Sequence, residues 1–122
     1  VKLASPEPIQ GKVMFAYAFS LEQIGDEIHR IWRNKPNNIT PELKHVAQMS
    51  LKSIHCAFAI YDRFCQDSVK ELIDIKQEIR AHVVPLLNKH TADILMRMVK
   101  LTELASDLTH LAVMRNTHVD NV

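Results

Sequence analysis

The sequence predicts an all-α protein, folded as an antiparallel bundle of about four helices. Only two of its 122 residues are Gly and 47% are apolar, a composition typical of helical proteins. Apolar residues recur in steps of three and four over long stretches, which is the helical period. These stretches are joined by short connections, which favour antiparallel neighbours. The length fits one domain over residues 1–122.

The first expected helix runs from about Pro8 to Arg33 and stops at the turn-forming segment 34–38. Its apolar positions follow the helical period and are Met14, Tyr17, Leu21, Ile24, Ile28 and Ile31. A second helix is expected to begin at Thr40 and Pro41, because Thr is a good N-cap and Pro suits the first helical position. Its apolar stripe consists of Leu43, Val46, Ala47, Ile54, Phe58, Tyr61 and Cys65.

The apolar pattern restarts just after Cys65, where Asp67 or Ser68 is a suitable N-cap. No Gly or Pro marks this point, so residues 41–84 form either one long helix or two. Pro85 and the polar residues after it end the third segment.

The fourth helix is expected to fade near Asn116, leaving residues 117–122 as a flexible tail. It carries apolar side chains on more than one side, and such a helix usually has two packing partners. It is therefore expected either at the centre of the bundle or at the interface of a homodimer.

Composition narrows the classes of function. The net charge is +1 and the basic residues are scattered singly, so neither nucleic-acid binding nor polybasic membrane binding is expected. The longest apolar run, residues 13–19, is too short to span a bilayer. No signal peptide is seen, and Cys56 and Cys65 lie too far apart on a helix to pair, so a reduced, cytoplasmic protein is expected. The Val at position 1 suggests a trimmed chain or one domain of a longer protein.

A Glu-x3-Asp-x2-His pattern occurs twice, 81 residues apart. Positions i, i+4 and i+7 share one face of a helix, so each copy stacks two carboxylates and an imidazole. The like charges repel each other, and neither column contains a basic residue that compensates them. A divalent metal between the columns, shared across a helix–helix interface, would do so. The candidate metal ligands are therefore Glu22, Asp26, His29, Glu103, Asp107 and His110.

The segment Leu21–Asp26, Leu-Glu-Gln-Ile-Gly-Asp, resembles the signature helix of the PhoU-like regulators of phosphate transport. That family carries Leu-Glu-Arg-Ile-Gly-Asp, with Asn commonly three positions after the Asp; here the Arg position holds Gln23 and the Asn position holds His29. Glu103 with residues 104–107 is similar to a diverged second copy. Residues 62–79 are similar to the acidic helix of the family, which also occurs in cytosolic tails of sodium–phosphate cotransporter-like proteins.

This resemblance implies a three-helix PhoU-like repeat preceded by the last helix of an earlier repeat. It implies iron or zinc clusters on the bundle surface at Glu22, Asp26, Glu103 and Asp107, whereas the two His residues are added from spacing alone. It also implies a non-enzymatic regulator of phosphate uptake, located at the inner face of the membrane. Its partner would be a membrane phosphate transporter or a sensor kinase.

Two alternatives remain at this stage. A ferritin-like oxidase or metal-storage bundle uses Glu-x-x-His pairs, and the steps from Asp26 to His29 and from Asp107 to His110 have that spacing. It requires ligands inside the core, whereas both triads lie on the flank of the apolar stripes. The other alternative is a helical interaction module without metal. The acidic column Asp67, Glu71, Asp74 and Glu78 is expected to be a solvated face, and His45, His55, His82, His90 and His118 are expected to be isolated.

Overall fold

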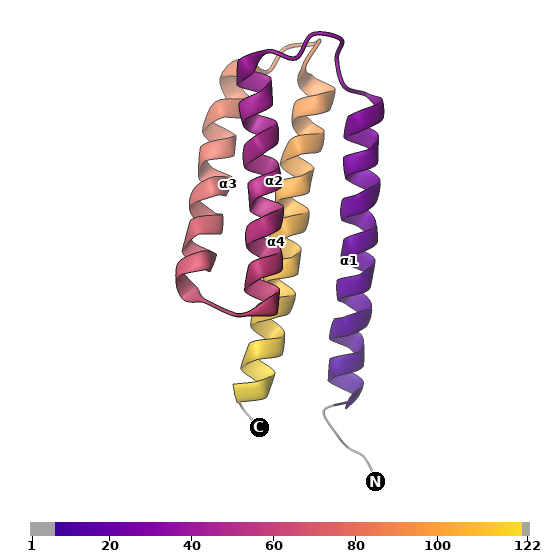
Figure 1. Cartoon of the computed structure of the whole chain (residues 1–122), viewed down its shortest axis with the longest axis vertical. Coiled ribbons are helices and arrows are strands. Elements are labelled where there is room, and N and C mark those ends of the chain that lie inside the picture. The colour runs from indigo at the N-terminus through magenta and orange to yellow at the C-terminus, as the bar shows by residue number, and fades with distance from the viewer. Residues whose placement is uncertain (1–6, 121–122) are drawn as a thin grey trace.

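The computed structural model describes residues 7–120, and the side chains of residues 11–115, as four α-helices (Figure 1). They are α1 (Glu7–Arg33), α2 (Pro41–Asp62), α3 (Gln66–Leu86) and α4 (Ala92–Asp120). Each helix runs opposite to the one before it in the chain, and the described residues contain no strand. The predicted all-α antiparallel bundle is confirmed.

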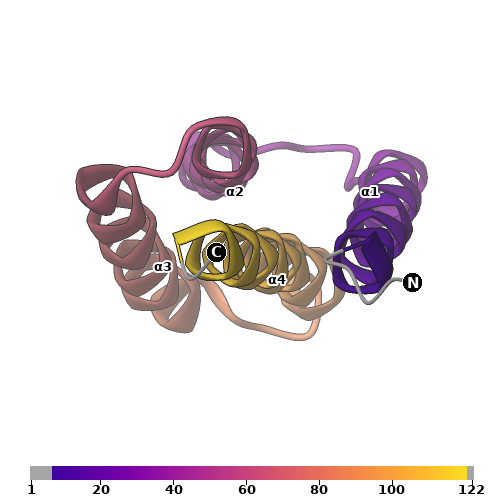
Figure 2. The same cartoon turned by 90° about the horizontal axis from the view of Figure 1, so that it is seen from below.

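Helix α4 lies at the centre of the bundle, which is one of the two positions that its apolar pattern predicted. Its backbone packs against α1, α2 and α3, while α2 also packs against α3. Viewed along the helices, α1 lies on one side of α4 and α3 on the other (Figure 2). Within the described helices, the backbone of α1 approaches only α4. The molecule is therefore a three-helix bundle of α2, α3 and α4 with α1 added along α4.

The closest helix pair is α2 with α4, which run in the same direction because one helix lies between them in the chain. Small residues line this interface: Ser53 and Ala57 on α2 and Ala105 on α4 are almost completely buried. The hydroxyl of Ser50 lies within hydrogen-bond distance of two carbonyl oxygens, that of Val46 at 3.0 Å and that of Met98 on α4 at 3.3 Å. Small side chains thus let the two backbones approach each other, and the buried hydroxyl of Ser50 still donates a hydrogen bond.

Helix boundaries confirm one predicted cap and correct another. The Thr40 hydroxyl accepts a hydrogen bond from the Leu43 backbone N–H at 3.2 Å, with Pro41 at the first helical position. Residues 41–84 form two helices, and the N-cap of α3 is Cys65. The prediction of Asp67 or Ser68 as the cap was wrong because the chain is already extended at Cys65.

The fourth helix is longer than its apolar pattern indicates. The predicted end near Asn116 was wrong, since α4 continues to Asp120. Residues 121 and 122 of the predicted tail lie outside the described residues.

The apolar residues of α1 divide between two faces. Ile24 is buried against the core and Tyr17 and Ile31 pack on it, as predicted. Met14, Leu21 and Ile28 of the predicted stripe are exposed. The positions that they were expected to occupy are filled by Val13, Ser20 and Glu27, all of them buried. The sequence pattern missed this because it treats every apolar residue near the stripe as buried and every charged residue as exposed.

Among the described residues, none of the helices combines the length and the apolar character that crossing a membrane requires.

Candidate functional site

All six predicted metal ligands lie on the surface. Each of the three side chains from α1 and the three from α4 is exposed. The ferritin-like alternative requires ligands that point into the bundle, so this exposure argues against it. In neither triad do the three ligand atoms lie close enough together to hold one metal ion. The described residues contain one group of three or more ligands that does, and it includes none of the six predicted residues. Metal binding by the triads stays a prediction.

The second triad is compensated by cations that its own helix does not provide. Arg80 on α3 donates a hydrogen bond to Glu103 at 3.3 Å, and the Lys76 ammonium lies 3.6 Å from the other carboxylate oxygen. The interpretation that no basic residue neutralises this column was therefore wrong, because the neutralising side chains come from the neighbouring helix. Repulsion between Glu103 and Asp107 no longer requires a metal.

A buried carboxylate ties α1 to α4. Glu27 is 1% exposed, and its two oxygens lie 3.3 Å from Arg30 on the same helix and 3.6 Å from Arg97 on α4. A hydrogen bond from Arg97 to Asp93 raises the pKa of the guanidinium, which therefore stays charged. The oxygen facing Arg97 is ion-paired but too distant for a hydrogen bond. The contact is thus mainly coulombic.

An apolar groove runs between α1 and α2, with α4 as its floor. The two helices meet at one end of it, where the rings of Tyr17 and Tyr61 stack with centroids 4.0 Å apart. Toward the α1–α2 loop the groove opens into two adjoining hollows of about 140 and 510 Å³. Both hollows are lined by Ile31, Trp32, Ala47 and Met98.

The groove has an apolar wall and a basic rim. Ile28 and Leu51 border the smaller hollow, and each exposes 40% or more of its surface. Trp32 is 67% exposed, and the ammonium of Lys35 lies 3.6 Å from its ring centroid. Lys35 and Lys44 border the larger hollow. Contiguous exposed apolar surface of this kind marks interaction sites more often than solvated faces.

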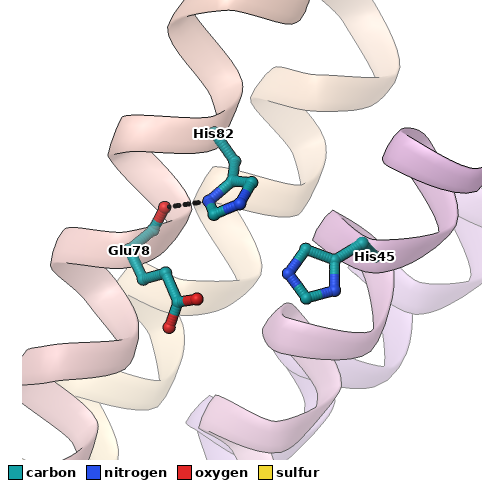
Figure 3. Close-up of side chains that lie close together, drawn as sticks. All are labelled: His45, Glu78 and His82. Carbon is teal, nitrogen blue, oxygen red and sulfur yellow. Dashed lines mark hydrogen bonds between the residues drawn. The ribbon is translucent and has the colours of Figure 1, made fainter.

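A cluster that the sequence interpretation missed lies between α2 and α3 (Figure 3). The ligand atoms of His45, Glu78 and His82 all lie within 4.8 Å of one another. His45 and His82 had been interpreted as isolated, and Glu78 as part of a solvated face. The four-residue step from Glu78 to His82 could have indicated a pair on one helical face. The contribution of His45 depends on how α2 and α3 pack, which the sequence does not contain.

The two thiols are expected to differ in reactivity. Cys65 is exposed and is the N-cap residue of α3. Its side chain makes no capping hydrogen bond, but the nearby backbone N–H groups of Ser68 and Asp67 lower the pKa of its thiol. Burial raises the pKa of Cys56, with a smaller contribution from the charge of Glu71. Since the thiolate is the nucleophile, alkylation by iodoacetamide should be faster at Cys65.

Mass spectrometry of the alkylated peptides across a pH series measures this difference. The rate at Cys65 should reach half of its maximum at a lower pH than the rate at Cys56. Equal rates, or a faster reaction of Cys56, would contradict the assignment. Cys65→Ser should remove the fast phase and leave the slow one.

Comparisons of the chain with protein-family models, with curated proteins and with solved structures give no match.

Proposed function

We propose that this chain is a non-enzymatic, cytoplasmic adaptor that regulates phosphate uptake by binding a helix of a membrane phosphate transporter or sensor kinase. The observation that carries the proposal is the apolar groove between α1 and α2. The residues that resemble the PhoU-like signature lie on α1, the helix that forms one wall of this groove. The resemblance supplies the phosphate connection, and the groove supplies the means of contact.

The groove suits an amphipathic helix better than a small substrate. Its lining is almost entirely apolar, and a helix laid in such a groove buries its own apolar face by contacts at positions i, i+3, i+4 and i+7. Lys35 and Lys44 border one side, so an acidic flank on the bound helix would be attracted to this rim. Apart from Lys35 and Lys44 at the rim, the described lining of the two hollows carries no titratable side chain, which favours binding over catalysis.

The position of α1 provides a mechanism of regulation. Within the described residues the backbone of α1 packs against α4 alone, so a shift of α1 relative to α2 would break the Tyr17–Tyr61 stack and leave the three-helix core in place. A partner helix inserted between α1 and α2 would fix their separation. Binding of the partner would then depend on the distance between α1 and α2, so a change in that distance would regulate binding.

Ile28→Asp tests the proposal, because it places a charge in the wall of the groove at an already exposed position. Phe19→Asp is the matched control: Phe19 is an apolar residue of α1 that is 53% exposed, about half a turn from Ile28 around the helix axis. Phosphate uptake and its repression by phosphate are measured in cells that carry each variant in place of the native chain. Circular dichroism checks that both variants fold.

Ile28→Asp should abolish the dependence of uptake on external phosphate, whereas Phe19→Asp should preserve it. Native regulation in both variants would refute the groove as the contact surface. If Ile28→Asp instead changes the oligomeric state of the purified chain, as measured by size-exclusion chromatography with light scattering, a second copy occupies the groove. That result would also overturn the proposal.

A further inference from the structure

We propose that His45, Glu78 and His82 form a zinc site that clamps the open end of the α2–α3 hairpin. The site is separate from the six carboxylate and imidazole ligands predicted from sequence, and it does not depend on the proposed role in phosphate uptake. Two imidazoles and one carboxylate are a ligand set that zinc accepts, with a fourth position left for water or another donor.

The ring of His82 is already oriented for metal binding. Its Nδ1 lies 2.9 Å from the backbone carbonyl oxygen of Glu78 (Figure 3). A carbonyl oxygen can only accept, so Nδ1 carries a proton, and in the neutral ring Nε2 then presents a lone pair. Second-shell hydrogen bonds of this kind fix the tautomer and the ring orientation of metal-binding His residues.

The other two ligands approach His82 from different directions. His45 extends from α2 toward α3, and its ring centroid lies 5.0 Å from that of His82 (Figure 3). Among the described residues, the Glu78 carboxylate forms no ion pair, unlike Glu27 and Glu103. Its charge is therefore available to a cation.

Only small side-chain movements are needed to close the site. The three ligand atoms lie within 4.8 Å of one another, and tetrahedral zinc with bonds of about 2.0–2.1 Å holds its ligand atoms about 3.3 Å apart. All three side chains are exposed, so they can rotate without disturbing the core. A hollow of about 260 Å³ lies beside His82 and is also bordered by Glu42.

The location of the site gives it a structural consequence. The connection between α2 and α3 covers residues 63–65, at the opposite end of the hairpin (Figure 1). His45 and His82 are near the end where the chain does not join the two helices. Directly beneath them, Val46, Ile79 and Val83 belong to one buried cluster. Zinc at this point should hold the two helices together over that cluster and stabilise the fold, because the three ligands are brought together by folding.

The test is isothermal titration calorimetry, in which zinc alone is added to the purified, metal-free full chain. His45→Ala and His82→Ala remove ligands, and His55→Ala is the matched control, an exposed His on α2 that is outside the cluster. The double variant Asp26→Asn/Asp107→Asn controls for the predicted carboxylate columns. The visible spectrum of bound cobalt(II) reports geometry, since four-coordinate cobalt absorbs far more strongly than six-coordinate cobalt.

The native chain, His55→Ala and Asp26→Asn/Asp107→Asn should each bind one zinc ion at this site, with the same affinity. His45→Ala and His82→Ala should each weaken binding by at least about 100-fold. At about a hundredfold excess of zinc over Kd, the melting temperature of the native chain should rise by about 8 °C, and those of the two ligand variants should not. Absence of saturable binding, equal binding by His45→Ala and His55→Ala, or loss of binding in the Asp26→Asn/Asp107→Asn variant would each overturn the proposal.

Discussion

Leu108→Ala should lower the free energy of unfolding by about 3–4 kcal/mol. Leu108 is fully buried on α4, in the cluster that joins α4 to α1, α2 and α3. Truncation removes its apolar contacts and leaves a cavity that three neighbouring helices cannot all move to fill. Because α4 is the central helix, the loss should appear as one cooperative transition at lower denaturant, with an unchanged dependence on denaturant concentration.

Val113→Ala is the control for this prediction. Val113 lies on the same helix but is 39% exposed, so its truncation should change the free energy of unfolding by less than about 0.5 kcal/mol. Urea unfolding followed by circular dichroism measures both. Similar losses for the two variants would mean that α4 is not the centre of the core.

Glu27→Ala should cost about 2 kcal/mol, although Glu is normally a surface residue. The substitution removes the one buried carboxylate that pairs with Arg97 across the α1–α4 interface. Both Arg partners are partly exposed and can be rehydrated, so the loss is smaller than that expected on breaking a fully buried pair. Because α1 packs its backbone on α4 alone, hydrogen exchange should become faster in α1 while α2 and α3 keep their protection.

Glu22→Ala provides the comparison, since Glu22 is an exposed carboxylate of the same helix. It should change stability by less than about 0.5 kcal/mol, as measured by urea unfolding. If Glu22→Ala and Glu27→Ala destabilise the chain equally, the contact between Glu27 and Arg97 does not hold α1 in place.

Sequence pattern predicts the helices of this protein well because each depends on local information. The period of apolar residues, the Thr40-Pro41 start and the polar turn after Arg33 are properties of neighbouring residues, and all three are confirmed. The burial of Glu27 and the exposure of Ile28 depend instead on where α4 lies. A helical wheel cannot distinguish two apolar faces when only one of them has a partner.

The surroundings of the candidate sites also depend on contacts between helices, which a sequence pattern does not contain. Spacing along one helix indicated the two triads, but Glu103 is neutralised by side chains of α3. His45 is brought to Glu78 and His82 by packing between helices. Both features are contacts between residues far apart in sequence. The groove was also missed, since it depends on how the backbones of α1 and α2 both pack on α4 and, within the described residues, do not approach each other.

Removing the gene for this chain tests whether the chain regulates phosphate uptake, as we propose. Uptake of radiolabelled phosphate is measured in cells with and without the gene, after growth in abundant and in scarce phosphate. The proposal predicts that cells lacking the chain take up phosphate at the same rate in both conditions and that the native gene restores the difference. Normal repression of uptake in cells without the chain would contradict the claim.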